Sequence, residues 1–170
     1  INTIEPMAFS GCKELKELNL PEGLENIGYG FIANTGITNL TVPSTVTGGD
    51  CDYGREGILE GSVLETLIFA DGIKMIPGYF CYKGGYGRDN YTLQHIEIQE
   101  SVTEIGEKAF DRCAALEEIE IGKEINRVGN SAFQDCTGLK KVRFQKNDKT
   151  VITNAGKKLY PVTIGRQAFA

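Results

Sequence analysis

Residues 93–98, Leu-Gln-His-Ile-Glu-Ile, return 23 residues later at 116–121 as Leu-Glu-Glu-Ile-Glu-Ile. The match continues without a gap as far as Cys113 in the first copy and Cys136 in the second. A third copy begins at Leu139, another 23 residues on. In each copy the last two apolar residues are two apart, which is the period of a strand with one buried face. The sequence therefore predicts a repeat in which every unit supplies one short strand.

Further units of this kind extend along the chain, and we predict a single domain over residues 1–170. Full units start at residues 15, 37, 64, 93, 116 and 139, so that successive starts are 22, 27, 29, 23 and 23 residues apart. Partial units run from Ile4 to Cys12 and from Ile164 to Phe169. The longer spacings predict insertions near residues 47–52, 81–92 and 146–163, and the last should form a small hairpin.

Such a repeat predicts a solenoid, because one unit cannot bury its apolar side whereas stacked units share a continuous core. The strands should lie side by side, parallel and in sequence order, about 4.8 Å apart. The glycine after Ile105 or Val128 permits a tight turn, and the Ala-Phe pair that follows places a small residue against a large one. We expect a right-handed, β-rich solenoid of about six repeats of about 23 residues, with short turns or helical pieces opposite the sheet.

The full pattern, L-x-x-I-x-I-P-x-x-V-x-x-I-G-x-x-A-F-x-x-C, resembles the BspA-like subclass of leucine-rich repeats over essentially the whole chain. Residues 15–27, 93–113 and 116–136 match it most closely, whereas the units that start at Ile37 and Leu64 depart from its second half. The resemblance implies a bacterial protein that is secreted or attached to the cell surface. Some members of this family are implicated in adhesion to host proteins or to other cells.

Composition and charge exclude several classes of partner. The chain has 18 basic and 23 acidic residues, a net charge of −5, and no run of five basic residues, so we expect no nucleic-acid partner. No stretch approaches the roughly 18 apolar residues of a membrane span, so we expect no membrane insertion. Because it has neither an initiator methionine nor a signal peptide, we expect a fragment of a longer chain.

The residues needed for catalysis or for metal binding are scarce. His95 is the only histidine, and it occupies an outward position of its strand, so a Ser-His-Asp or Cys-His arrangement is not expected. No Cys-x-x-Cys pair is present, and the loop-like stretch 50–54 departs from the spacing of a calcium loop. We therefore predict no enzyme activity, no cofactor and no metal.

Three of the five cysteines, Cys12, Cys113 and Cys136, occupy one phase of the repeat. We predict that this phase is buried and that these thiols are reduced, because cysteine in a core behaves as a small hydrophobe. Cys113 and Cys136 lie one repeat apart, within disulfide reach, but their side chains should point the same way. The states of Cys51 and Cys81 are left open.

The outward strand positions offer a first candidate surface. Opposite charges should meet across neighbouring strands as Glu117–Lys140, Glu118–Lys141 and Glu120–Arg143. Such pairs either stabilise the sheet or form a concave polar face for a partner. His95, Lys140, Lys141 and Arg143 are therefore candidate partner-binding residues.

The insertion at 81–92 is the second candidate surface, because it carries Tyr82, Tyr86, Arg88 and Tyr91 among glycines. Tyrosine and arginine on a glycine-rich loop are favoured interface residues. The insertion is either a binding loop or a tolerated excursion of the chain. If a macromolecule binds, we expect this loop to contribute more affinity than the charged strands.

The function that these observations favour is a non-catalytic binding module for adhesion, with a protein or glycan ligand at the bacterial cell surface. The alternative is a structural spacer that holds another domain of a larger surface protein. The two differ in whether the domain itself contacts a ligand. The ligand's identity and the oligomeric state are left open.

Overall fold

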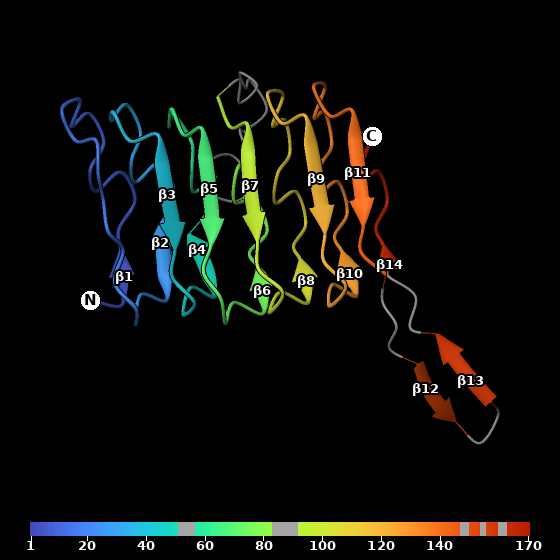
Figure 1. Cartoon of the computed structure of the whole chain (residues 1–170). Coiled ribbons are helices and arrows are strands. Elements are labelled where there is room, and N and C mark those ends of the chain that lie inside the picture. Colours follow the sequence, from blue (N-terminus) through green and yellow to red (C-terminus); the bar gives the residue numbers. More distant parts are fainter. Residues whose placement is uncertain (51–56, 83–91, 147–149, 154–155, 160–162) are drawn as a thin grey trace.

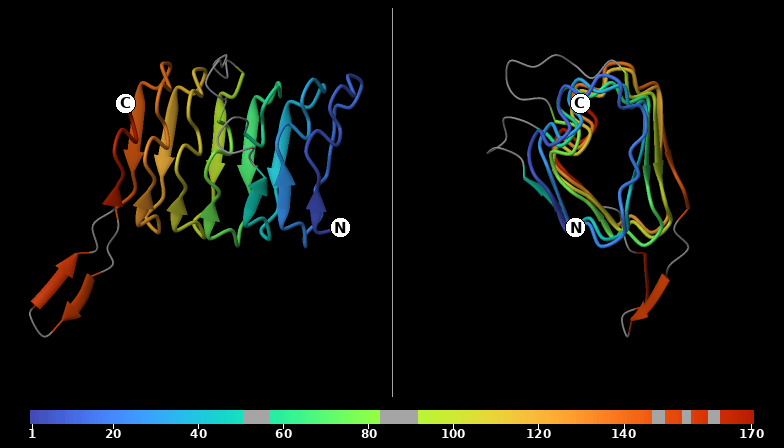
Figure 2. Two further views of the ribbon diagram at one scale, coloured as in Figure 1. Left: turned by 180° about the vertical axis from the view of Figure 1, so that it is seen from behind. Right: turned by 90° about the vertical axis from the view of Figure 1, so that its left-hand side faces the viewer.

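A computed structural model describes residues 1–50, 57–82, 92–146, 150–153, 156–159 and 163–170. The chain winds into a right-handed solenoid whose coils follow one another in sequence order (Figure 1, Figure 2). Two layers of short parallel strands enclose the core, as the end-on view of Figure 2 shows. Within the described residues there is no helix long and apolar enough to cross a membrane.

The front layer holds the strands that the repeat predicts, namely β3 (Asn39–Val42), β5 (Thr66–Phe69), β7 (His95–Ile98), β9 (Glu118–Ile121) and β11 (Lys141–Phe144). They run parallel and in sequence order, as predicted (Figure 1). One hydrogen-bonded ladder joins β3, β5 and β7, and a second joins β9 and β11. Residues 15–20 run beside β3 but form no ladder with it, so the prediction of a sixth strand at this place is wrong.

The back layer consists of very short strands followed by turns, so the expected turns are present, whereas the described residues contain no helix. Several of these strands end at an Ile-Gly or Val-Gly step, and there Val128 pairs with Ile105 of the preceding coil. The strands of this layer are β1 (Thr3–Ile4), β2 (Asn26–Gly28), β4 (Gly48–Asp50), β6 (Met75–Ile76), β8 (Glu104–Ile105), β10 (Arg127–Val128) and β14 (Thr163–Ile164).

The glycine of the Ile-Gly step allows the backbones of neighbouring coils to stack closely, and it does not adopt a left-handed turn conformation. A Cβ atom on Gly129 would lie 2.6 Å from the backbone nitrogen of Glu107 in the preceding coil, and the φ of Gly129 is not positive. The turn itself comes two residues later, where Ser131 has a φ of 54° and the matching Lys108 a φ of 51°. Glycine is therefore needed because two backbones nearly touch at this step.

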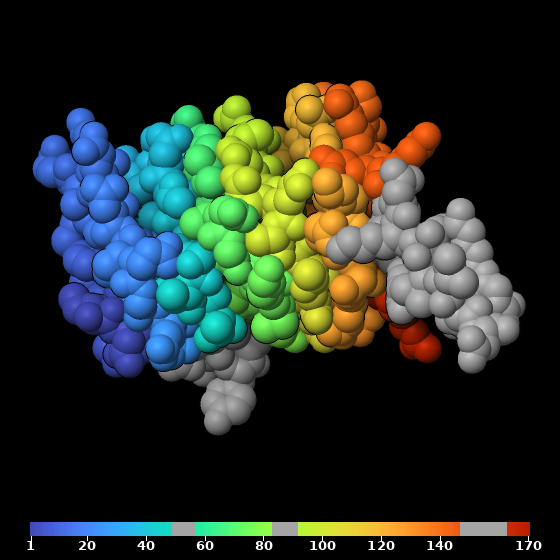
Figure 3. Space-filling model, turned by 60° about the horizontal axis from the view of Figure 1, so that its bottom comes forward, coloured from blue at the N-terminus to red at the C-terminus, as the bar shows by residue number. Residues whose placement is uncertain are grey.

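The core is a row of phenylalanines that runs along the solenoid axis. Phe110 lies between Phe69 and Phe133, with ring centroids 6.1 and 5.2 Å away, and Phe133 stacks on Phe169 at 5.1 Å. Phe110 is completely buried. Figure 3 shows the coils as adjacent bands along the axis, which agrees with contacts made mainly between neighbouring coils.

The cysteine predictions are met in part. Cys113 and Cys136 are buried as expected, but Cys12 is exposed, so its predicted burial is wrong. Cys12 lies in the first coil of the described residues. Cys81 is also buried, and the thiol of Cys136 donates to the carbonyl oxygen of Phe110 at 3.1 Å. No disulfide joins the described cysteines.

The insertions differ in form. The hairpin predicted within residues 146–163 is present as β12 (Thr150–Thr153) and β13 (Gly156–Leu159), which pair antiparallel and project from the solenoid (Figure 1). The expected insertion near 47–52 overlaps β4, which pairs with β2 and so belongs to the back layer. Of the insertion at 81–92, residues 83–91 lie outside the described part.

Candidate ligand-binding groove

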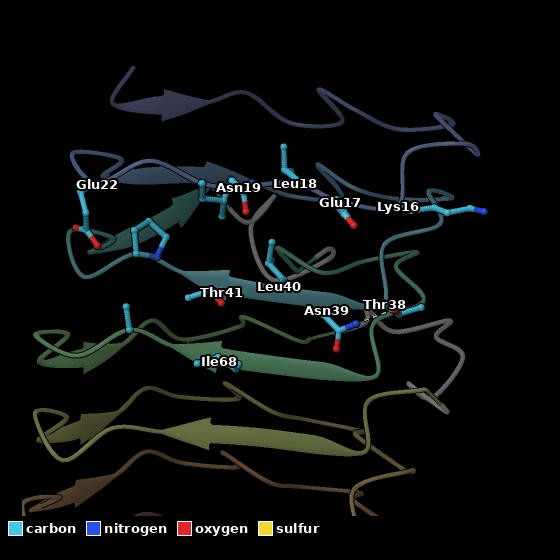
Figure 4. A pocket seen from close by; sticks show the side chains of 13 residues that line it. Lys16, Glu17, Leu18, Asn19, Glu22, Thr38, Asn39, Leu40, Thr41 and Ile68 are labelled. Carbon is cyan, nitrogen blue, oxygen red and sulfur yellow. Dashed lines mark hydrogen bonds between the residues drawn. The ribbon is translucent and has the colours of Figure 1, made fainter.

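A groove opens on the front layer between residues 16–22 and β3, with a volume of about 670 Å³ (Figure 4). It crosses the place where the sixth strand was expected. Figure 4 shows Leu18 and Asn19 on one wall and Thr38, Asn39 and Thr41 on the other. The lining residues are Lys16, Glu17, Leu18, Asn19, Leu20, Glu22, Thr38, Asn39, Leu40, Thr41, Pro43, Ile68 and Ala70.

The groove is held together at its two ends and is open between them. At one end the backbone N–H of Gly36 donates to the carbonyl oxygen of Leu15 at 2.9 Å. At the other end the carboxylate of Glu22 accepts hydrogen bonds from the N–H and the hydroxyl of Ser44, at 3.1 and 2.8 Å. Between these points no backbone hydrogen bond joins residues 16–20 to residues 39–42, all of which are described.

The edge of β3 therefore presents unpaired backbone groups to the groove. In the β3–β5 ladder, the N–H of Thr66 donates to the carbonyl oxygen of Thr38 and that of Ala70 donates to Val42. Because the groups of a parallel strand alternate in direction, those of Leu40 also face β5. The N–H and C=O groups of Asn39 and Thr41 then face residues 16–20, where no described backbone group pairs with them.

The groove combines apolar side chains with polar walls. Leu40 is 2% exposed, and Leu18, Leu20 and Ile68 are half-buried. On the walls, Asn39 is exposed and its amide nitrogen donates to the Thr38 hydroxyl at 3.0 Å. Lys16 and Glu22 lie toward the two ends, Glu17 lies across the groove from Asn39 (Figure 4), and the lining contains no aromatic residue. This arrangement suits hydrogen bonding to an uncharged ligand, and its lining holds no nucleophile–base pair.

The charged candidates lie at the opposite end of the front layer, on and beside β11. Lys140 pairs with Glu117 at 2.8 Å, as the sequence predicted. Arg143, however, pairs with Glu118 at 3.1 Å and not with Glu120, although Glu120 stands opposite it in the ladder. The long guanidinium side chain reaches the diagonal neighbour, and Glu120 accepts a hydrogen bond from Gln145 instead.

Lys141 stands opposite Glu118 in the ladder, as expected, but no ion pair between them is present. His95 is exposed on β7, opposite Thr66, so its outward orientation is confirmed. β9 lies between β7 and β11, so the structure does not bring His95 into one cluster with the basic residues. The predicted role of these residues in binding a partner stays a prediction.

Tyr82 is the one member of the predicted binding loop that the structure describes. Its ring meets that of Tyr79 edge to face, with centroids 5.3 Å apart, and the Lys108 ammonium lies 4.9 Å from its centroid. The Tyr79 hydroxyl is 3.1 Å from a Glu107 carboxylate oxygen. Tyr82 thus belongs to a packed aromatic and cationic cluster. Tyr86, Arg88 and Tyr91 lie outside the described residues, and the role of the loop stays a prediction.

Sequence reasoning did not identify the groove. Asn39 and Thr41 occupy ordinary outward positions of the repeat, and a missing ladder leaves no mark on apolar periodicity. One sequence signal could have pointed to the groove. Residues 39 and 41 are neutral, whereas the equivalent outward positions of the later repeats carry charged side chains such as Glu118 and Arg143. Among the described residues, no group of three or more His, Cys, Asp or Glu side chains is placed to hold a metal ion.

Comparison with known proteins agrees with the geometry. The sequence model of the BspA type leucine rich repeat region matches residues 1–84 and 55–160, with six copies of the repeat. No curated protein matches the chain.

Two solved structures share the fold. A leucine-rich repeat protein from Bacteroides ovatus is 21% identical, with a TM-score of 0.61 over 99% of this chain and 44% of its own. A leucine rich cell surface protein from Faecalibacterium prausnitzii is 20% identical, with a TM-score of 0.52 over 91% of this chain and 45% of its own. The chain thus spans less than half the length of either protein. With the repeat, the two-layered solenoid and the match of the family model over most of its length, the chain belongs to the BspA-type leucine-rich repeat family.

Proposed function

We propose that this domain is a non-catalytic binding module of a bacterial cell-surface protein, and that it takes a protein or glycan ligand on its front layer with the groove as the central contact. The observation that carries the proposal is the open edge of β3, where backbone groups of Asn39 and Thr41 face a cavity of about 670 Å³. That volume lies within the usual range of ligand pockets, about 300–1,000 Å³.

The groove is a better ligand site than the charged end of the front layer. Lys140 and Arg143 already have carboxylate partners on or just before β9, so a ligand would have to displace formed pairs for little gain. Among the described residues, the edge groups of β3 have no backbone partner. A ligand that supplies one replaces hydrogen bonds to water and gains apolar contact with the half-buried Leu18.

A location at the cell surface is part of the same proposal. The structural relative from Faecalibacterium prausnitzii is described as a cell surface protein, and this chain shares its fold. Repeat solenoids expose a long continuous face and carry insertions as loops, which suits contact with large ligands. A surface location would give this face direct access to them.

The proposal is tested by binding to immobilised gastric mucin, which displays both protein and dense glycans. The intact chain is compared with an Asn39→Ala and Thr41→Ala double variant by biolayer interferometry. The control is Asn126→Ala, because Asn126 is an exposed asparagine on the back half of a coil far from the groove. Removing two or three hydrogen bonds of about 0.5–1.5 kcal/mol each should weaken binding by about tenfold, while the control binds as the intact chain does.

Two results would count against the proposal. Equal binding by the double variant and the intact chain would place the contact elsewhere than the groove. Absence of any binding to mucin, with all variants folded by circular dichroism, would favour the structural spacer instead.

A further inference from the structure

We propose that the ligand of the groove is a neutral saccharide, whose hydroxyl groups bridge the unpaired backbone groups of β3 and the facing segment 16–20. This inference rests on the proposed binding function and names the chemical class of its ligand. It follows from three features of the groove: its closed ends, the predominance of carboxylates over cations in its lining, and its half-buried apolar side chains.

The closed ends argue against an inserted peptide strand. Adjacent strands lie about 4.8 Å apart, so a strand placed between β3 and residues 16–20 would need them about 9.6 Å apart. The walls are tied together at both ends, by the 2.9 Å bond from Gly36 to Leu15 and the 2.8 Å bond between Ser44 and Glu22. Only six residues separate Leu15 from Glu22, so a strand could enter only if one of these ties broke.

A row of hydroxyl groups can pair with the backbone groups of both walls without breaking the hydrogen bonds at the ends of the groove. No backbone hydrogen bond joins the two walls between their ends, and each wall offers backbone donors and acceptors. A hydroxyl group is both a donor and an acceptor, so one oxygen atom can accept from an N–H on one wall and donate to a C=O on the other. Saccharides carry several such groups at fixed spacing on a rigid ring.

The charges of the groove favour a neutral ligand over an acidic one. Its polar side chains are the amides of Asn19 and Asn39, the hydroxyls of Thr38 and Thr41, and the carboxylate of Glu17, which lies across the groove from Asn39 (Figure 4). The one cation of the lining, Lys16, stands at one end and is outnumbered by two carboxylates, Glu17 and Glu22. An acidic ligand group between the walls would lose its hydration and meet a like charge, whereas a saccharide hydroxyl can donate to the Glu17 carboxylate.

Half-buried apolar side chains supply the contact that a sugar ring requires. Leu18 and Ile68 are half-buried in the groove lining, whereas Leu40, 2% exposed, belongs to the core and offers almost no surface. Figure 4 shows Leu18 and Asn19 on the wall that faces β3. The C–H face of a saccharide ring can cover Leu18 and Ile68 while its edge hydroxyls reach the polar walls.

The test is amide exchange by NMR on the uniformly labelled full chain, with and without millimolar maltohexaose, cellohexaose or mannohexaose. A hyaluronan hexasaccharide serves as the acidic probe, and a capped Thr-Val hexapeptide as the strand-forming probe. We expect at least one neutral hexasaccharide to slow exchange of the Asn39 and Thr41 amides. The Leu40 amide, which is in the ladder with β5, should not change.

Two substitutions separate side-chain from backbone contributions. Asn39→Ala should weaken binding of the neutral saccharide by about three- to tenfold, and Asn126→Ala should leave it unchanged. Thr41→Val removes the hydroxyl but keeps the backbone N–H, so protection of that amide by the saccharide should persist. Protection by the peptide or by hyaluronan alone, or by no probe, would overturn the inference.

A last experiment distinguishes failure of the saccharide inference from failure of the proposed binding function. Periodate cleaves the vicinal diols of mucin glycans and leaves the protein chain in place. If the chain binds intact mucin but not periodate-treated mucin, the saccharide ligand is supported. If it binds both equally through the groove, the ligand is protein, and the inference fails while the proposed function stands. If it binds neither, the proposed function itself fails.

Discussion

Replacement of Gly129 by alanine should destabilise the solenoid, because two coils come into near contact at this residue. A Cβ atom at Gly129 would lie 2.6 Å from the backbone nitrogen of Glu107 and 2.6 Å from the carbonyl carbon of Gly106. Both are backbone atoms of the preceding coil, so neither can move away as a flexible side chain would. The coils would have to separate at the β8–β10 ladder, where Val128 pairs with Ile105.

The expected cost is about 1–3 kcal/mol, as for overpacking of a dense core. Gly122→Ala is the matched control, because a Cβ atom there would meet nothing within 4 Å and the φ of Gly122 is not positive. That change should be neutral or stabilising by up to about 1 kcal/mol, since alanine reduces the entropy of the unfolded chain.

Urea unfolding followed by circular dichroism measures both variants against the parent chain. The account requires Gly129→Ala to lower the midpoint clearly and Gly122→Ala to leave it unchanged or to raise it. Equal midpoints for the two variants would show that the coils are not in close contact at the Ile-Gly step, and the explanation of its glycine would be wrong.

Three further predictions concern the core, the thiols and the loop. Phe110→Ala should cost about 3–5 kcal/mol in urea unfolding, because Phe110 is completely buried, whereas Phe144→Ala, at a side chain 48% exposed, should cost clearly less. The neighbouring Cys113 thiol, together with burial, raises the pKa of the Cys136 thiol. A raised pKa means that the folded state favours the protonated thiol. The resulting stabilisation of the folded state is complete below the pKa of the unfolded thiol, about 8.5, and is lost as the pH rises above that value. Native thiol titration at pH 8 should therefore leave Cys113 and Cys136 unmodified until denaturant is added, and a Cys113–Cys136 crosslink in mass spectrometry would contradict their reduced state. Finally, Tyr86→Ala with Arg88→Ala should weaken mucin binding more than Lys140→Ala with Lys141→Ala in calorimetry at physiological salt, since truncated hot spots cost about 2 kcal/mol or more and exposed charge pairs about 0–1. A larger loss of affinity from the Lys140 and Lys141 variant would place the contact on the basic strand β11 instead.

The front layer was predictable because four residues of alternating exposure, such as Glu118 to Ile121, carry a clear period of two. The back layer was not, because strands such as Glu104–Ile105 contain only two residues and show no period. The same Ile-Gly step was interpreted as a turn. Its glycine has a tertiary cause, the approach of a neighbouring backbone, which a single repeat cannot reveal.

The candidate site was less predictable than the fold. The direct pair of Glu117 and Lys140 followed from register, but the diagonal pair of Arg143 and Glu118 depends on side-chain length and on competition from Gln145. The groove depends on a backbone ladder that fails to close beside β3, although the apolar pattern of residues 15–20 is intact. The phase of the repeat also failed to predict the exposure of Cys12, although it predicted the burial of Cys113 and Cys136.

The exchange rate of the Thr41 backbone amide in the free chain tests the central claim most directly, because the proposed site requires that the edge of β3 be open. Hydrogen exchange followed by NMR should show Thr41 and Asn39 exchanging rapidly, while Leu40, between them in sequence, is protected by its ladder with β5. Protection of Thr41 equal to that of Leu40 would mean that residues 16–20 complete the sheet. In that case no groove with free backbone groups would exist, and the account of binding would be wrong.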